Sequence, residues 1–362
     1  GLDLHTYTVE SRLEHAPMGP LSGSVGFSGM RQGNISKGKA FLIPQYRLYT
    51  GALFASEEVD AGWATLSAGA RYEYRWQRVF EFEDAGIDVP DETRVYDDVA
   101  AALGVSVPFG DGWSMGFTTG RAWRAPNVNE RYSQGVHHGT AQYEIGDPRL
   151  EKETTWSVDG TLRHAGRTVD LQLSAYQNLI ANYIYLEPRE PVLSIRGAYP
   201  AFNYAQTDAR IRGIEVSGRL TLVEGLDVTV SGSALRGTDR VDAGPLYDMP
   251  ADRGTVGLRW EVPSLSWAAR PFVEISTTVV RDQTRVPEGT IYALPTDGYQ
   301  LLDAELGSQA VRIGGHPVNV GLEVKNVFDT RYRDYLSRYK LFVDDTGRDV
   351  VLRIRVPLGS AF

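Results

Sequence analysis

Cysteine is absent from the 362-residue chain, which excludes disulfides, zinc sites built on thiolates and cysteine nucleophiles. Long hydrophobic runs are missing as well. No stretch approaches the roughly 18 uncharged apolar residues of a membrane-spanning helix, and the mean hydropathy is -0.28. A helical membrane protein is therefore excluded. A membrane β-barrel is not, because each of its strands needs only about ten residues of alternating character.

An excess of positive charge is also lacking. Lys and Arg number 37 against 46 Asp and Glu, and the formal net charge is -9. Because phosphate binding needs a concentrated basic surface, nucleic acid is not expected as a partner. The chain has no H-E-x-x-H helix and no glycine-rich phosphate loop after a strand. We therefore expect neither an enzyme nor a bound cofactor.

Period-two alternation runs along almost the whole sequence, and helical spacing is nearly absent. From residue 64 to residue 77, apolar and aromatic side chains share one face, and small or charged side chains share the other. The apolar face starts with small aliphatic residues and ends in Tyr72, Tyr74 and Trp76. This order is typical of a strand that crosses hydrocarbon and ends in an interfacial girdle of aromatic residues.

A second strand repeats the pattern. Its apolar face runs through residues 169–181, with Gln177 as the one polar break, and leads to Tyr183 and Tyr185, which we predict to join the same girdle. Other strands carry regular charges on their second face, for example Arg163 and Glu323. The core of a soluble sandwich cannot take these charges, so a polar lumen with a lipid-facing exterior fits better.

The links between strands alternate between short turns and long loops. Short links include residues 16–20, 164–167, 223–226, 262–265 and 314–317, and long links include 80–93, 126–151, 187–202, 239–252, 282–298 and 329–347. Outer-membrane barrels show this asymmetry between their periplasmic and outer sides, whereas a sandwich or propeller does not require it. We predict an all-β protein, a transmembrane antiparallel up-and-down β-barrel with about fifteen strands, and a single domain over residues 1–362.

The last residue is an aromatic one at the end of an alternating strand. Ile354 and Val356 share the face of Phe362, while Arg353 and Arg355 occupy the other face. A terminal aromatic residue of this kind is what bacterial barrel-assembly machinery recognises, so Phe362 is the predicted assembly signal. A soluble edge strand that ends in Phe is the alternative.

Three segments resemble the TonB-dependent outer-membrane receptors. Residues 124–132, Arg-Ala-Pro-Asn-Val-Asn-Glu-Arg-Tyr, followed by Leu-Glu-Lys-Glu at 150–153, are similar to the family's Arg-Ala-Pro strand end, loop and Leu-x-x-Glu strand start. Residues 324–332, Val-Lys-Asn-Val-Phe-Asp-Thr-Arg-Tyr, resemble the motif before its last strand, and residues 211–215, Ile-Arg-Gly-Ile-Glu, are a weaker match. The resemblance covers essentially the whole chain.

This resemblance implies a barrel of about 22 strands with a plugged lumen. The chain would supply its C-terminal strands, and we expect the plug domain, the segment that contacts the TonB energy-transducing complex and about seven strands to be absent. The implied function is active uptake of a scarce metal or metal chelate (iron-siderophore, haem or zinc) across the bacterial outer membrane. The implied partners are the TonB complex, this substrate, membrane lipids and the assembly machinery. A passive porin and an outer-membrane enzyme are the alternatives.

The predicted outer loop at residues 126–151 groups potential ligand donors. They are His137, His138, Glu130, Tyr132, Glu144 and Asp147. Nitrogen and oxygen donors of this kind bind divalent metals or ferric chelates, so we predict substrate or metal binding here. Solvated or loop-bracing roles are the alternative, since adjacent histidines usually point to opposite faces. The His-His pair also resembles a zinc-uptake branch of the family.

Overall fold

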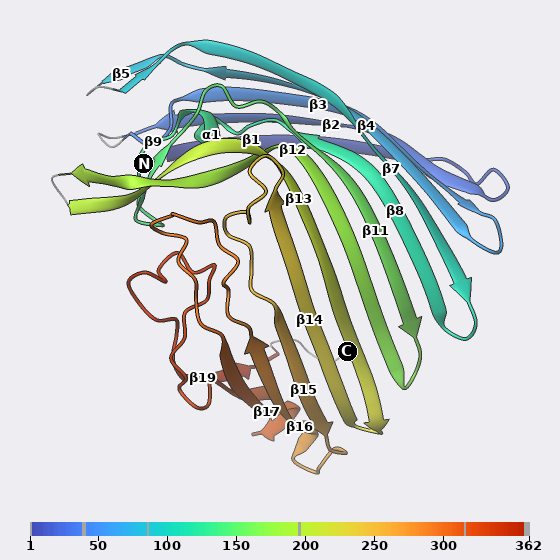
Figure 1. The fold of residues 1–362 in the computed structure, drawn as a ribbon. Coiled ribbons are helices and arrows are strands. Elements are labelled where there is room, and N and C mark those ends of the chain that lie inside the picture. Colours follow the sequence, from blue (N-terminus) through green and yellow to red (C-terminus); the bar gives the residue numbers. More distant parts are fainter. Residues whose placement is uncertain (1, 38–40, 85–86, 195–196, 315, 358–362) are drawn as a thin grey trace.

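The computed structural model describes residues 2–37, 41–84, 87–194, 197–314 and 316–357. Fifteen strands form one antiparallel meander in which each strand pairs with the next (Figure 1). In chain order they are β1 (Leu2–Glu14), β2 (Leu21–Ser36), β3 (Tyr46–Asp60), β4 (Thr65–Val79), β7 (Glu92–Phe109), β8 (Trp113–Arg124), β11 (Glu153–Ala165), β12 (Val169–Ser194), β13 (Gly197–Val223), β14 (Leu226–Asp239), β15 (Arg253–Glu261), β16 (Ala268–Val280), β17 (Tyr299–Ile313), β18 (His316–Lys325) and β19 (Asp349–Arg355). The predicted all-β meander is confirmed.

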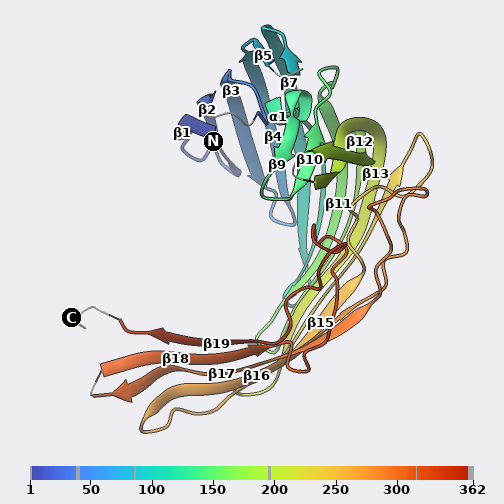
Figure 2. The same cartoon turned by 90° about the vertical axis from the view of Figure 1, so that its left-hand side faces the viewer.

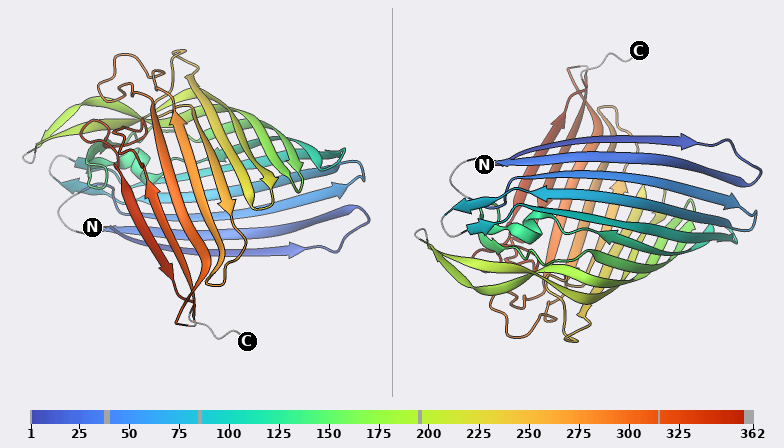
Figure 3. Two further views of the ribbon diagram at one scale, coloured as in Figure 1. Left: turned by 90° about the horizontal axis from the view of Figure 1, so that it is seen from below. Right: turned by 90° about the horizontal axis from the view of Figure 1, so that it is seen from above.

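The sheet curves strongly but stays open. Among the described residues, β1 pairs with β2 alone and β19 pairs with β18 alone, and Figure 2 shows these two edge strands well apart. The strands lie side by side from one edge to the other in both views of Figure 3. Phe362, the predicted assembly signal, lies outside the described residues.

Short elements occupy two of the long links. The hairpin of β5 (Phe82–Asp84) and β6 (Ile87–Val89) lies between β4 and β7, and helix α1 (Val128–Tyr132), β9 (Gln134–His137) and β10 (Gln142–Ile145) lie between β8 and β11. Strand β10 pairs with β9 and also runs parallel to β13. No helix among the described residues is long and apolar enough to cross a membrane.

The alternation of links is confirmed, with one correction. Residues 125–152, 240–252, 281–298 and 326–348 connect strands at one end of the sheet, and short turns such as 61–64 and 224–225 connect them at the other. The predicted loop at 187–202 is wrong, because β12 and β13 continue as a paired hairpin through most of this segment. Beyond Ala181, β12 has no pairing with β11, so Pro188 occupies a free edge where its missing N–H costs nothing.

The two faces of the sheet differ as the alternation predicts. Large apolar side chains are exposed along one face, among them Leu53 (66%), Leu103 (62%) and Ile214 (56%). Tyr72 and Tyr74 lie on this face and are also exposed. Exposed apolar surface on so many strands exceeds what a soluble monomer shows, and it fits contact with lipid.

The predicted position of Tyr183 and Tyr185 on this face is wrong. A register shift between Ile180 and Tyr183 places one extra residue in β12, with Asn182 at φ 58°. Such a bulge moves the side chains that follow it to the other face, here as far as a second register shift after Arg189. Tyr183 therefore shares the face of Ile180 and packs near Leu246, and Tyr185 stacks on Tyr247 of the 240–252 link at 5.5 Å between ring centroids.

Candidate functional site

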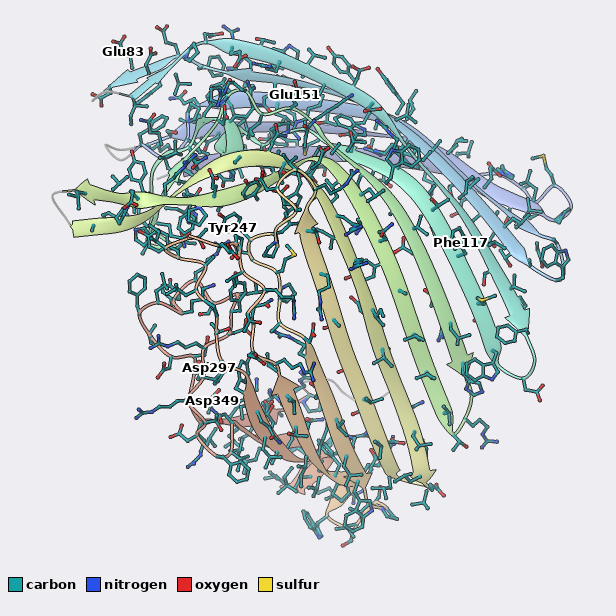
Figure 4. All side chains as sticks on the ribbon, in the orientation of Figure 1. Glu83, Phe117, Glu151, Tyr247, Asp297 and Asp349 are labelled. Atoms are coloured by element: carbon teal, nitrogen blue, oxygen red, sulfur yellow. The ribbon has the colours of Figure 1, made fainter. Side chains whose placement is uncertain are left out.

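The long links lie at one end of the sheet, and there they build the candidate site. Figure 4 places Tyr247 among these links, beside the base of the β12–β13 hairpin. Loops held by a rigid sheet are the usual position of binding residues.

Helix α1 is held against the sheet wall by the charged residues of the Arg-Ala-Pro segment. Arg124, at the end of β8, donates to both carboxylate oxygens of Glu130 at 3.0 and 2.9 Å and to Glu153 at 3.1 Å. Glu130 also accepts the backbone N–H of Asn127 at 2.7 Å, which completes a capping box. Glu130 is thus a positioning residue with its carboxylate already in use.

The next two side chains of α1 are buried and paired. Arg131, 1% exposed, donates to the carbonyl of Pro148 at 2.7 Å and to Glu92 at 3.0 Å. The Tyr132 hydroxyl donates to the same Glu92, and burial with this carboxylate beside it raises the pKa of Tyr132. Gly146 lies so close that a Cβ there would stand 2.4 Å from the Arg131 carbonyl carbon. The helix and the returning chain therefore pack tightly.

The two histidines of this link lie apart from most of the other predicted donors. His137 accepts or donates a hydrogen bond with Thr140 at 3.0 Å, and its Nδ1 lies 3.9 Å from Glu144. His138 is exposed. Asp147 pairs with Arg149 at 2.9 Å, and this hydrogen bond lowers the pKa of Asp147. Of the predicted set, His137 and Glu144 are the side chains seen close together, while a backbone hydrogen bond of 3.0 Å joins Asp147 to Glu130.

Within the described residues, no group of three or more His, Cys, Asp or Glu side chains is placed to hold a metal ion. Glu144 itself accepts a hydrogen bond from Tyr204 at 3.2 Å. A bare metal ion would need at least three such ligands from protein. The arrangement therefore offers one imidazole and one carboxylate rather than a finished metal centre.

A pocket at the same end of the sheet draws on five separate segments. Its cavity volume is only about 40 Å³, well below the roughly 300–1,000 Å³ found for small-molecule sites, so it is a narrow cleft between the links. The 125–152 link contributes Gln142, the β12–β13 hairpin Phe202, and the three later links Tyr247, Tyr292 and Tyr335. Phe202 and Tyr292 are in ring contact at 5.4 Å.

The 326–348 link forms much of the pocket wall and contacts its neighbours. The Tyr339 hydroxyl donates to the Gly139 carbonyl at 2.9 Å, and Arg338 lies 3.4 Å from Asp248. Burial raises the pKa of Tyr335 to about 12 and lowers the pKa of Lys340. Sequence reasoning missed these residues, although the aromatic and basic run at 331–342 was a signal that could have pointed to them.

Known proteins resemble this chain over most of its length. The family model described as TonB dependent receptor-like, beta-barrel, matches residues 7–346. The TonB-dependent heme receptor A of Haemophilus influenzae (strain 86-028NP) is 23% identical over 349 residues, 86% of this chain and 45% of that protein.

Solved structures share the fold at low identity. The copper transporter OprC matches with a TM-score of 0.80 and 16% identity, over 98% of this chain and 57% of its own. The FrpB iron transporter from Neisseria meningitidis (F3-3 variant) matches with a TM-score of 0.72 and 15% identity, over 98% of this chain and 55% of its own. The chain thus spans about half the length of the proteins it matches.

Proposed function

This chain belongs to the TonB-dependent receptors, β-barrel proteins of the bacterial outer membrane, and from that premise we propose that it serves the active, TonB-coupled uptake of a metal chelate. The relatives are named as receptors and transporters of heme, copper and iron. The chain supplies barrel wall and outer links, and residues 1–362 act as one domain of the receptor. Its partners are the TonB complex, the chelate, membrane lipids and the barrel-assembly machinery, for which Phe362 is the signal.

The observation that carries this proposal is the convergence of five segments on one pocket at the long-link end. Each segment connects different strands, so the pocket exists only when the sheet is curved as it is. A receptor needs a binding surface on the side from which scarce substrate arrives, and this end provides it.

The potential metal-ligand donors of the 125–152 link have a secondary role in this proposal. We propose that His137 and Glu144, 3.9 Å apart, reach an open coordination position of a chelated metal, with exposed His138 beside them. Glu130, Tyr132 and Asp147 hold the link in shape through the contacts described above. A zinc ion without a chelator would find too few ligands in this arrangement.

The other two functions have weaker support. A passive porin needs no loop pocket and no family match of this kind. For an enzyme, residues 112–116, Gly-Trp-Ser-Met-Gly, have the spacing of a nucleophile elbow. That motif requires a sharp strand-to-helix turn, whereas Ser114 lies within β8 and pairs with Arg163 of β11.

The proposal is tested with the full-length receptor in a host that depends on it for iron or zinc. Deletion of the gene should abolish growth on a limiting metal chelate, and the parent gene should restore it only while the TonB complex is intact. His137→Ala with His138→Ala, at matched surface expression, should reduce uptake without lowering barrel content. Uptake that persists at the parental rate without the TonB complex would establish a passive pore instead.

A further inference from the structure

Two arginines of β13 lie on the apolar, lipid-facing side of the sheet without a partner. Arg210 and Arg212 precede Ile214 at a spacing of two residues, so their side chains leave the strand on the same face as Ile214. Neither guanidinium makes a hydrogen bond or an ion pair within the part of the chain that the structure describes, and the Nε of Arg210 is buried without an acceptor. Both cations are therefore available to an anion from outside the protein.

The neighbouring strands β12 and β14 form an open groove around Arg212. In the register, Gln177 of β12 and Arg236 of β14 lie directly beside Arg212, and the three strands are adjacent in Figure 1. Arg236 is neutralised by Asp252, which leaves Arg210 and Arg212 as the unpaired charges. The groove has a cavity volume of about 470 Å³, and most of its lining residues are on the apolar face, namely Ala175, Gln177, Arg212, Ile214, Ala234 and Arg236.

These cations lie at the outer boundary of the apolar band. Arg212 is twelve residues before the short turn at 224–225, and Trp76, which ends an apolar face, is likewise twelve residues after the short turn at 61–64. At about 3.3 Å per residue and a tilt of about 35–45°, twelve residues raise a side chain by roughly 30 Å, more than the apolar band of about 25 Å. Because the long links of such barrels face outward, Arg212 reaches the head-group region of the outer leaflet.

A phosphate head group fits the two arginines. Their side chains leave the strand about 7 Å apart, so the two positive charges repel each other until an anion lies between them. A guanidinium donates two parallel hydrogen bonds to phosphate oxygens, which also satisfies a buried donor such as the Nε of Arg210. Phosphate is therefore a better partner here than a carboxylate of the protein, since none is within reach.

Acyl chains fit the surface next to the arginines. Towards the membrane centre, the same face continues through Ile214 and Val216, with Ala175 and Ala234 on either side of Ile214. These apolar side chains have no protein neighbour above them, since Ile214 is 56% exposed. A ligand with a phosphate at one end and hydrocarbon at the other matches both parts of the surface.

We propose that Arg210 and Arg212 bind a phosphate of lipid A, the phosphorylated glycolipid of the outer leaflet, and that its acyl chains lie along Ile214 and Val216. The site is on the outside of the sheet, so it anchors the wall to the surrounding lipid and does not depend on which substrate the receptor takes up. Gln177 is the polar neighbour that completes the site.

Native mass spectrometry of the full-length receptor in detergent tests the inference. The probes are diphosphoryl lipid A, the same glycolipid without its phosphates, and inorganic phosphate as a competitor. One variant combines Arg210→Gln with Arg212→Gln. The matched control combines Arg163→Gln with Arg219→Gln, because these two arginines are also exposed and unpaired among the described residues but lie on the polar face. Mobility of the unheated protein on an SDS gel shows whether each variant is folded.

Diphosphoryl lipid A should bind the parent better than the dephosphorylated glycolipid. The Arg210 and Arg212 double variant should bind it about thirtyfold more weakly, as expected for the loss of two arginine contacts with an anionic head group, while the control pair stays within about twofold of the parent. If the double variant does not fold, Arg212→Gln alone should weaken binding about fivefold. Equal binding by the variant and the parent, equal binding of the dephosphorylated glycolipid, or displacement of lipid A by an equal concentration of inorganic phosphate overturns the inference.

Discussion

Asp252 lies outside the pocket and pairs with two arginines. Arg236 of β14 donates to both of its carboxylate oxygens, at 2.5 and 2.8 Å, and Arg285 of the next link lies 3.4 Å away. Asp252 ends the link that presents Tyr247 to the pocket. One carboxylate therefore joins two pocket-forming links to the end of a strand.

The order of this link should depend on pH. The hydrogen bond from Arg236 lowers the pKa of Asp252 below its ordinary value. A carboxylate with a lowered folded pKa stabilises the folded link above the unfolded pKa of about 3.9, and the contribution is lost as pH falls through the folded pKa.

Pepsin should therefore cut residues 240–252 of the parent progressively faster below about pH 4, and Asp252→Asn should be cut fast throughout. Asp242→Asn is the control, since the Asp242 carboxylate makes no ion pair among the described residues. If pepsin cuts the Asp252→Asn variant at the parental rate at pH 5, Asp252 does not hold this link in order.

At the scale of single elements, the strands could be predicted from the sequence, but the side-chain directions beyond the bulge in β12 could not. Alternation correctly predicted strands along residues 64–77 and 169–180, because side-chain direction in a strand follows from position alone. The face of Tyr183 and Tyr185 was mispredicted, because one extra residue at Asn182 is invisible in the alternation and reverses the side chains that follow it, as far as a second register shift after Arg189. The extension of the β12–β13 hairpin was missed because proline normally marks the end of a strand.

Asn182 should tolerate glycine better than a β-branched residue. Its φ of 58° is the left-handed region, which costs a β-branched residue about 1–3 kcal/mol. Its side chain also donates to the Lys152 carbonyl at 3.3 Å. In chemical unfolding of the receptor in detergent, Asn182→Gly should lose about 1 kcal/mol, and Asn182→Val should lose more. Asn178→Val, at a regular position of the same strand, should be nearly neutral. If the Asn182→Val variant is as stable to unfolding as the Asn182→Gly variant, the backbone of the bulge relaxes to fit the branched side chain.

At the scale of the whole molecule, the fold was predictable and the pocket was not. The same alternation of side chains recurs in many strands. A wrong prediction for one element therefore leaves the predicted all-β fold class unchanged. The pocket depends on Gln142, Tyr247 and Tyr335 meeting across almost two hundred residues of chain, and no local pattern encodes such a meeting. The predicted donors were neighbours in sequence, yet most of them face different partners once α1 folds against the wall.

The sidedness of the sheet leads to a prediction about the membrane itself. Ile214 lies in the middle of β13, 56% exposed, between Ala175 and Ala234 on the apolar face. Ser217 lies three residues further along the same strand and on the opposite face, between Gln172 and Ser231. A lysine at position 214 must place its charge in hydrocarbon, whereas one at position 217 stays in the polar lumen. In unfolding of the full-length receptor from lipid vesicles, Ile214→Lys should cost about 2–4 kcal/mol and Ser217→Lys less than about 1 kcal/mol.

The comparison needs a control for size, because lysine also removes the packing of isoleucine. Ile214→Met keeps the apolar character and a similar volume, so it should cost less than about 1.5 kcal/mol. The difference between Ile214→Lys and Ile214→Met then reports the charge alone. It should shrink when the receptor is transferred from vesicles to a detergent that leaves this face more hydrated. Equal losses for the lysines at 214 and 217 would mean that both faces of β13 meet the same solvent, which would contradict a lipid-facing exterior for this sheet.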